Sequence, residues 1–391
     1  MHTNKMESCK SVYDPQEDST ILESCVKQYA KGKVLDIGTG SGIQAVAAAQ
    51  KSDVKSVLAT DIQEGVIKYC KETIKNRKIK FLQSDLFQNI KGKFDLIIFN
   101  PPYLPQELKL KDLTLEGGKK GYEVIERFLD EVNNFLNKEG IVLVVFSSLT
   151  KKEKVEEFIK NNLLDFEELG KLHIFFEDIY VYLLRKNDFL KKLENKNIKN
   201  VKYLTKGHRG LLFTGFRNKK IVIKTKNPKS QAINRIENET KWLKKLNEHK
   251  IGPKLLRSEN SYFIYEYIGG DFVVDYLEKS GKTKIKKVIK NIFGQMFVLD
   301  KLRVDKEEMH HPVKHIIISK DRPYLLDFER THHVQSPKNV TQFCQFLMGY
   351  HIGEILKNKK INIDRKKLIK LAKIYKIKQN NKNFRKIIQI L

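Results

Sequence analysis

The sequence is poor in cysteine, and its cysteines are not spaced as a metal site or a redox pair. The four cysteines among 391 residues stand far apart, at positions 9, 25, 70 and 344. This argues against a zinc site built on cysteines and favours reduced thiols. The chain also has no run of about 18 apolar residues, and its first ten residues lack the apolar core of a secretion signal. We therefore expect a cytoplasmic protein without a membrane contact.

Acidic residues are scarce in the second half of the chain only. Residues 1–190 carry 28 Lys and Arg against 29 Asp and Glu, so the net charge of +28 lies almost entirely in residues 191–391. The composition is otherwise globular, with 40% hydrophobic residues and 22 Phe. A chain of this length exceeds one ordinary core, and its uneven charge predicts two modules with different partners.

The first half alternates short apolar strands with helical stretches. Strands are expected at 33–37, 56–61, 79–83, 94–99, 141–147 and 175–184, with helices to residue 50 and over 63–76, 121–137 and 151–162. Continuous apolar strands in repeated strand-helix units predict an α/β fold with a doubly wound sheet.

A glycine-rich turn follows the first expected strand. The segment DIGTGSG begins at Asp36 and places Gly38 and Gly40 where the backbone must turn tightly beside a ligand, while Asp61 ends the next strand. The spacing G-x-G-x-G differs from the dinucleotide fingerprint, and Asp36 would repel a pyrophosphate. S-adenosylmethionine, which carries a sulfonium and an amine, suits the turn better. Asp85 after the third strand would bind the adenine amino group or cap a helix.

A second motif, NPPY, follows the fourth expected strand at the same sheet edge. The Asn100 side chain and the Pro101 carbonyl can accept the two N–H bonds of a planar amino group, which favours positive charge on nitrogen in the transition state. Pro102 completes the turn and Tyr103 can pack on the planar group. These residues predict N-methylation of an amide or an aromatic amine, unless the segment is only a turn.

These motifs together with VYDPQEDS at residues 12–19 resemble the HemK-type release-factor glutamine methyltransferases, in their archaeal and eukaryotic branch. The resemblance covers about residues 10–186 and implies a Rossmann-like class I domain over 1–186; the polar, basic composition of residues 187–200 predicts a linker or a short helix there. It implies these roles: Asn100, Pro101, Pro102 and Tyr103 hold the substrate amide; Asp36, Gly38, Gly40, Asp61, Asp85 and Asn100 bind the donor; Tyr13 and Glu17 border the substrate.

The resemblance also implies a substrate and a partner. The substrate is the glutamine of the Gly-Gly-Gln loop in a class I peptide release factor, and the partner is a small zinc-binding activator protein covering an apolar strand edge. The rival interpretation is methylation of an amino base in nucleic acid, because NPPY serves both chemistries. The near-zero charge of residues 1–190 weakens that rival, although the basic second half could hold nucleic acid.

The second half carries a different set of residues. Gly207 and Gly210 precede an apolar strand that ends in Lys224, an arrangement suited to phosphate groups. The helix that follows carries Glu237 and Glu239, either of which could pair with Lys224, and we favour Glu239. The alternative is a glycine-bearing hairpin with an exposed lysine.

Residues 201–350 resemble the small atypical kinases of archaea, in the RIO and Bud-like lineage, which implies an α+β kinase-like domain. Asp327 in LLDFER would be the metal-binding residue, with ATP and Mg²⁺ as cofactors. The usual catalytic loop is absent; Glu308 stands where its Asp belongs, and His315 where its Asn belongs. Because histidine is a poor magnesium ligand, a weak kinase and a pseudokinase binding module are equally favoured.

Residues 351–391 form an expected lysine-rich helical tail. Over 355–391 it carries 13 Lys and Arg and one acid. Its apolar residues could form an inner face: Ile361, Ile363, Leu368, Ile369, Leu371 and Ile374. The basic surface is either simply solvated or binds RNA or the ribosome through phosphates.

Overall fold

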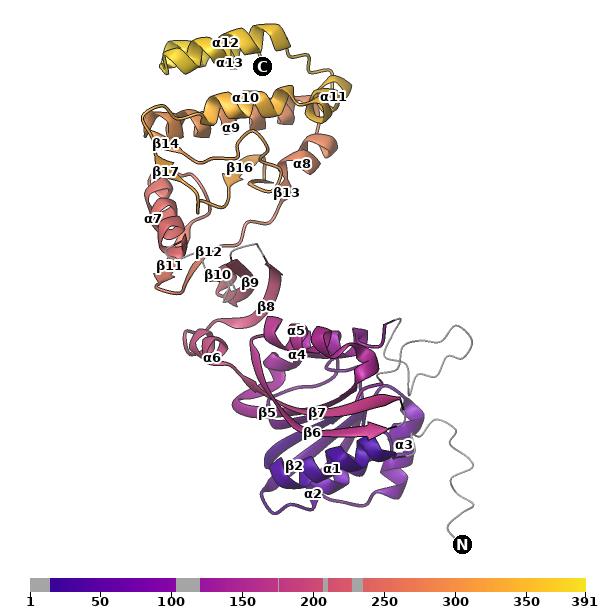
Figure 1. Ribbon diagram of the computed structural model, residues 1–391. Helices are drawn as coiled ribbons and strands as arrows, with labels where there is room; N and C mark the ends of the chain where they lie inside the picture. Colours follow the sequence, from indigo (N-terminus) through magenta and orange to yellow (C-terminus); the bar gives the residue numbers. More distant parts are fainter. Residues whose placement is uncertain (1–14, 103–119, 175, 207–209, 227–234) are drawn as a thin grey trace. The chain divides into compact units, whose positions relative to one another are not determined.

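The computed structural model describes residues 15–102, 120–174, 176–206, 210–226 and 235–391. The chain divides into two compact units, the first ending at Tyr203 and the second beginning at Leu204 (Figure 1). Each unit has its own hydrophobic core. No helix in the described ranges is both long and apolar enough to cross a membrane.

The first unit is built on a seven-stranded sheet of order β3-β2-β1-β4-β5-β7-β6. The first five strands are parallel, and β7 and β6 add antiparallel to the β5 edge. The strands are β1 (Gly32–Ile37), β2 (Val54–Asp61), β3 (Ile79–Gln83), β4 (Phe94–Phe99), β5 (Leu136–Ser147), β6 (Leu164–Ile174) and β7 (Glu177–Lys186). The expected α/β fold of the first half is thereby confirmed.

Helices cover both faces of this sheet, which explains why its central strands are apolar throughout. The helices α1 and α2 pack on one face, and α4 and α5 on the other (Figure 1). The helices are α1 (Glu17–Tyr29), α2 (Ile43–Ala49), α3 (Glu64–Thr73), α4 (Glu123–Phe135), the 3₁₀ turn η2 (Ser148–Thr150) and α5 (Lys152–Asn161).

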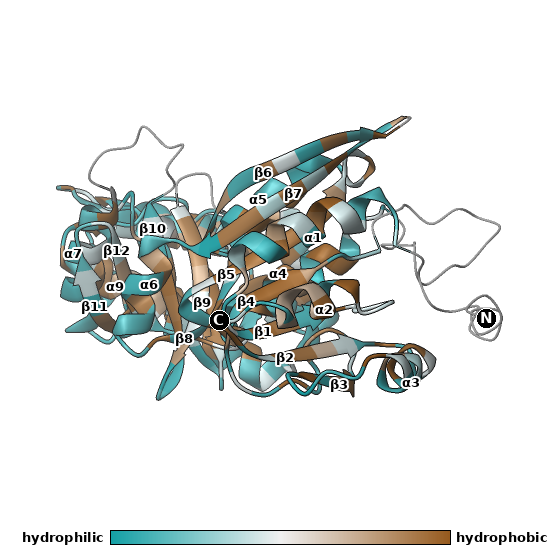
Figure 2. Ribbon diagram, turned by 90° about the horizontal axis from the view of Figure 1, so that it is seen from below, coloured by the Kyte–Doolittle hydropathy of each residue, from teal (hydrophilic) through white to brown (hydrophobic). Residues whose placement is uncertain are grey.

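One strand of this unit was not expected from the sequence, and one helix lies in the segment expected to be a linker or a short helix. Strand β6 mixes hydrophilic and hydrophobic residues along its length (Figure 2), because it lies at the sheet edge. The expected linker contains a helix, α6 (Asp188–Asn195), whose Leu190 and Leu193 are buried. The Asn187 side chain accepts a hydrogen bond from the Leu190 N–H and so caps α6. The segment is therefore packed structure rather than a free linker.

The second unit begins with a five-stranded sheet of order β11-β12-β10-β9-β8, followed by a mainly helical part. The sheet strands are β8 (Lys199–Lys206), β9 (Gly210–Arg217), β10 (Lys219–Lys226), β11 (Leu255–Glu259) and β12 (Tyr262–Glu266). Short strands form two small sheets: β13 (Asp271–Phe272), β14 (Val304–Asp305), β15 (Ile316–Ser319), β16 (Arg322–Leu325) and β17 (His332–His333). The helices are α7 (Arg235–Asn247), α8 (Val273–Lys279), α9 (Lys282–Lys301), α10 (Asn339–Met348), α11 (Tyr350–Asn358), α12 (Arg365–Ile377) and α13 (Asn381–Gln389).

The lysine-rich tail is part of the core of the second unit. Leu368 and Tyr375 of α12 and Ile387 of α13 are buried in the same cluster as residues of α9 and α10. The Tyr375 hydroxyl donates a hydrogen bond of 3.0 Å to Asp300 on α9. Leu368 is buried, as expected for a residue of the inner face, whereas Ile369 is 42% exposed and does not belong to that face.

Candidate functional site

A cavity of about 620 Å³ opens at the carboxyl ends of the parallel strands in the first unit. This size suits a nucleoside-sized ligand. Its wall includes the glycine turn after β1, Asp61 at the end of β2, Asp85 after β3 and the Asn100–Pro102 turn after β4. Sequence-predicted donor and substrate residues from four strand ends thus share one cavity. Tyr13 and Tyr103 lie outside the described residues.

The glycine turn has a backbone that side chains rarely permit. Gly38 has φ +66° and Gly42 has φ +85°, both in the left-handed region. At Gly42 an added Cβ would lie 2.3 Å from Ile74 Cδ1. Gly40, between them, donates its N–H to Asp61 Oδ2 at 3.2 Å. The glycine turn therefore packs closely against its neighbours. The floor of the cavity is formed by the backbone of this turn and by the carboxylates of Asp36 and Asp61.

Burial makes the ionised forms of the two carboxyls, Asp36 and Asp61, unfavourable. Asp36 is 1% exposed, and burial, with nearby Asp61, raises its pKa to about 7 although Thr39 donates a hydrogen bond to it. Burial also raises the pKa of Asp61. A cation bound in the cavity would relieve both carboxylates. The site therefore fits a positively charged ligand better than a phosphate.

Asp85 does not stand alone at the rim. Its carboxylate pairs with Arg127 of α4 at 2.8 Å, an ion pair that no local sequence pattern indicates. Nearby, Ile62 is 55% exposed, which is unusual for isoleucine, and lines the cavity with Leu86. The side chains of Ile62 and Leu86 suit packing against a flat ring of a ligand, and Asp85 lines the same cavity.

Asn100 lines the cavity, and one atom of its side-chain amide lacks a hydrogen-bond partner among the described residues. Its Nδ2 donates to Asp18 Oδ2 at 2.9 Å, and Ser19 Oγ lies 3.5 Å from the same nitrogen. Its Oδ1 is buried and has no hydrogen-bond partner within the described ranges. Buried polar atoms are rarely left unsatisfied, so this oxygen is a candidate ligand contact. Pro101 and Pro102 line the cavity beside it.

The first turn of α1 brings further residues that sequence reasoning missed. Glu17 lines the cavity as expected, and so do Asp18 and Ser19. Glu177 at the start of β7 lines it too, and accepts a hydrogen bond from Ser147. The available signal for Asp18 was its place in the EDS segment of the N-terminal motif; for Glu177 the sequence offered none.

The strand order, the glycine turn and the cavity define a class I S-adenosylmethionine-dependent methyltransferase. The family described as methyltransferase small domain matches residues 10–175. A protein of Methanocaldococcus jannaschii assigned to the protein N5-glutamine methyltransferases is 37% identical over 184 residues, which cover 45% of this chain and 93% of the relative. The chain therefore belongs to the HemK-type protein glutamine methyltransferase family.

Other relatives match a smaller share. The release factor glutamine methyltransferase of Lactococcus lactis is 33% identical over 120 residues, which are 28% of this chain and 44% of that enzyme. Among solved structures, the E. cuniculi Mtq2–Trm112 complex that methylates the eRF1 translation termination factor matches with a TM-score of 0.38 at 23% identity. That match covers 45% of this chain and 99% of the solved chain.

The second unit assembles its own charged cluster. Lys224 on β10 pairs with Glu239 of α7 at 2.6 Å and with Asp327, after β16, at 3.3 Å. Burial alone would lower the Lys224 pKa, but Glu239 and Asp327 outweigh it and the pKa is raised. The structure thus pairs Lys224 with Glu239 and not with Glu237. Gly210 lies beside this lysine, since an added Cβ would be 3.3 Å from Lys224 Cε; Gly207 lies outside the described residues.

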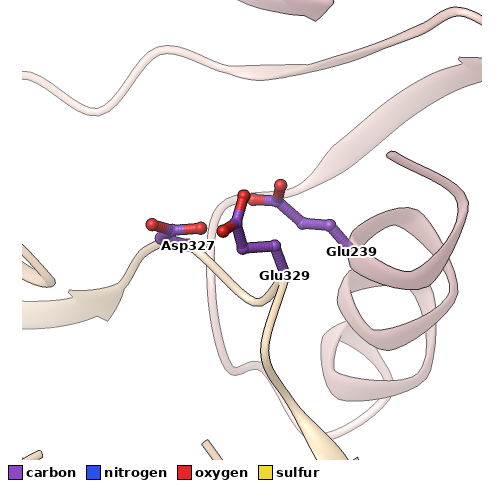
Figure 3. Close-up of side chains that lie close together, drawn as sticks. All are labelled: Glu239, Asp327 and Glu329. Carbon is purple, nitrogen blue, oxygen red and sulfur yellow. The ribbon is translucent and has the colours of Figure 1, made fainter. Parts of the chain in front are cut away.

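Three carboxylates of this cluster point toward one another (Figure 3). Oxygen atoms of Glu239, Asp327 and Glu329 lie within 4.8 Å of one another, with Glu239 coming from α7. Lys224 already neutralises part of their charge. The group offers oxygen ligands of the kind that Mg²⁺ prefers.

Glu308 and His315, the two residues expected at the positions of the catalytic-loop Asp and Asn, lie in contact with each other. Glu308 pairs with Arg330 at 2.5 Å and with His315 Nε2 at 3.2 Å. Burial lowers the His315 pKa, with Lys306 adding to the effect. Lys306 is buried and donates to the Asp327 carbonyl at 2.9 Å, and burial lowers its pKa to about 8. Glu308 is therefore paired with the Arg330 cation and in contact with His315, and it is not exposed as a free base.

Proposed function

We propose that the chain methylates the side-chain amide of glutamine in the Gly-Gly-Gln loop of a class I peptide release factor. The observation that supports this proposal is the buried Oδ1 of Asn100, which has no partner among the described residues and belongs to a residue lining the cavity. Support for the substrate comes from relatives named as release factor glutamine methyltransferases. The cavity is far less basic than a nucleic-acid surface requires, because residues 1–190 are nearly neutral.

The donor would supply an electrophilic methyl group on a sulfonium. Asp36 and Asp61 would face its cationic and hydroxyl groups, and Ile62 and Leu86 its flat base. Asn100 Oδ1 and the Pro101 carbonyl would accept the two N–H bonds of the glutamine amide, with Tyr103 packing on its plane. As the nitrogen bonds the methyl carbon, the carbon–sulfur bond of the donor would break and the sulfur would leave with its electron pair as a neutral thioether. These oxygens would stabilise the positive charge on the nitrogen, which would then lose a proton to solvent. Tyr13 and Glu17 would border the substrate.

The test is methyl transfer from labelled donor to a purified release factor. The acceptors offered are that factor, its Gln→Ala loop variant, bulk RNA and DNA. We expect label on the factor and none on its variant. Label on nucleic acid instead would overturn the proposal in favour of amino-base methylation, with the basic second half as the substrate clamp.

A small zinc-binding activator is proposed as a partner at the β3 edge of the sheet. Strand β3 ends the sheet, and its Phe81 and Leu82 are only partly buried. An apolar edge strand is a surface that a partner strand can extend. The test adds such an activator to the transfer assay; unchanged turnover and no complex by gel filtration would remove this partner.

We further propose that the second unit binds a magnesium nucleotide, as a weak kinase or a pseudokinase. The supporting observation is the Lys224–Glu239–Asp327 cluster beside Gly210, since phosphoryl transfer requires a lysine held by a helix glutamate and a metal-binding aspartate. Glu308 would be the acceptor of the substrate proton, but its pairing with Arg330 and His315 disfavours that role.

Magnesium-dependent binding and turnover of ATP separate these alternatives. We expect Asp327→Ala to abolish Mg²⁺-dependent ATP binding. Turnover that is lost on Glu308→Gln would establish a kinase or ATPase, whereas binding without turnover would establish a pseudokinase. No ATP binding by the unsubstituted protein would refute both.

The basic surface of α12 is proposed as an RNA contact. Lys366, Lys370 and Lys373 are exposed on α12, and each phosphate contact contributes to salt-dependent binding. Deleting the tail would unfold the second unit, because Tyr375 and Ile387 are buried in its core. The test is therefore a triple Lys→Gln variant of the exposed lysines. Equal RNA binding by variant and unsubstituted protein at low salt would remove this surface.

A further inference from the structure

The orientation of the Asn100 amide is fixed by one neighbouring side chain. A carboxylate only accepts hydrogen bonds, so the Asn100 group facing Asp18 Oδ2 at 2.9 Å must be its NH₂. The amide is planar, and its oxygen therefore points away from Asp18. That oxygen is buried and has no partner in the described part of the chain, and it belongs to a residue that lines the cavity.

Asp18 is itself held firmly. It is 3% exposed in the first turn of α1, where the helix dipole favours a negative charge. Its Oδ1 accepts the Ser19 N–H at 2.6 Å, and its Oδ2 accepts from Asn100. The Ser19 carbonyl accepts a hydrogen bond of 2.8 Å from Gln44 Nε2, which anchors this turn to α2. The carboxylate is thus fixed by a backbone N–H of its own helix, and the turn that carries it is anchored to a second helix.

We propose that Asp18 is the positioning residue for methyl transfer, holding the Asn100 amide so that its oxygen accepts the substrate N–H. This inference rests on the proposed function. Without Asp18 the amide can turn by 180°, because its oxygen and nitrogen differ little in size. A turned amide presents NH₂ to the N–H of the substrate, so two donors oppose each other and the substrate nitrogen is misplaced.

Asp18→Asn exposes this role because the replacement has one acceptor oxygen for two donors. If that oxygen stays on the Ser19 N–H, the new NH₂ faces Asn100 and forces the Asn100 amide to turn. The reciprocal double variant, Asp18→Asn with Asn100→Asp, restores a donor opposite a carboxylate and returns an acceptor oxygen to the cavity. The single variant Asn100→Asp places two carboxylates together and leaves no donor between them.

The first readout needs no activity. Side-chain amide NMR of the full chain labelled with ¹⁵N-asparagine, with the Asn100 signal assigned by its loss in Asn100→Ala, reports the Asp18 hydrogen bond. We expect the Asn100 signal to shift in Asp18→Ala and to stay in place in Glu23→Gln, a partly exposed acid of the same helix paired with Lys27. If the chemical shift of the Asn100 side-chain amide is unchanged in Asp18→Ala, the proposal is overturned.

The second readout is kinetic, with the release factor as substrate and S-adenosylhomocysteine binding by calorimetry as the control for pocket integrity. We expect Asp18→Asn to lower kcat about 100-fold, with inhibitor affinity within about twofold, and Glu23→Gln to change neither. The double variant should exceed either single variant at least about tenfold, as coupled residues do. If the loss of kcat in the double variant equals the product of the losses in the two single variants, the positioning role is overturned. No transfer by the unsubstituted protein would instead refute the proposed function, and the NMR readout would still decide the Asp18–Asn100 pairing.

Discussion

Replacing Lys224 with methionine tests the electrostatics of the second unit. Lys224 and Glu239 form a buried pair, with side chains 11% and 5% exposed. Burial raises the Glu239 pKa even with the lysine present. In Lys224→Met, Glu239 would lose its paired cation and lie beside Asp327, with the buried Lys306 still attracting both carboxylates. We expect one of these carboxyls to bind a proton when the variant folds. Removing one partner of a buried pair typically costs about 3–5 kcal/mol.

The size of this cost depends on pH in a predictable direction. Protonating a carboxyl of ordinary pKa 4.5 costs about 1.4 kcal/mol per pH unit, so about 3.4 kcal/mol at pH 7 and about 0.7 kcal/mol at pH 5. A carboxyl whose pKa is raised on folding contributes stability at low pH that is lost as the pH rises. At roughly 2–4 °C per kcal/mol, we expect Tm to fall by about 7–14 °C at pH 7 and by about 1–3 °C at pH 5.

The chain offers a selective probe for this measurement. Its single tryptophan, Trp242, is buried in the core of the second unit, so its fluorescence reports the unfolding of that unit. Lys244→Met, an exposed lysine on the same helix, is the matched control and should leave Tm unchanged. Equal deficits at pH 5 and pH 7, or no deficit at either, would refute the reasoning.

Three further predictions concern the donor cavity and the tail. Asn100→Ala should lower methyl transfer at least about 100-fold and leave S-adenosylhomocysteine binding intact by calorimetry; normal turnover would contradict its role. Because the pKa of Asp36 is about 7 and a cation favours its ionised form, donor affinity should rise between pH 6 and 8, and Asp36→Asn should remove that dependence. Tyr375→Phe removes a hydrogen bond to the buried Asp300 and should destabilise the second unit by about 1.5–3 kcal/mol by Trp fluorescence, whereas exposed Tyr350→Phe should have no effect.

The fold of the first unit was predictable because its strands are apolar throughout. A strand buried on both faces, such as Leu96–Phe99, needs no partner information to be recognised. Strand β6 was not predictable: its residues alternate between partly buried and exposed, as at any sheet edge, and they resemble a polar loop. For the α6 segment the sequence left a linker and a short helix as alternatives, since two buried leucines in a short basic stretch carry little periodic signal.

The site was predictable where chemistry is encoded in adjacent residues. Asp36, Asp61 and Asn100 each end or follow a strand, so topology alone brings them to one edge. Arg127 and Glu177 reach the same cavity from α4 and from the antiparallel β7. Their position at the cavity depends on how α4 and the β6–β7 hairpin pack on the sheet, and no local sequence pattern indicates that packing.

Each site draws the residues described here from within its own unit. The donor cavity is lined from α1, α4, β7 and the ends of the parallel strands, and the Lys224 cluster from β10, α7 and the turn after β16. Because each unit also has its own core, a substitution in one site should leave the readout of the other unchanged. Asn100→Ala should therefore not shift the unfolding reported by Trp242, and Lys224→Met should not alter S-adenosylhomocysteine binding at temperatures below its own transition. A loss of inhibitor binding in folded Lys224→Met would mean that the two units are energetically coupled.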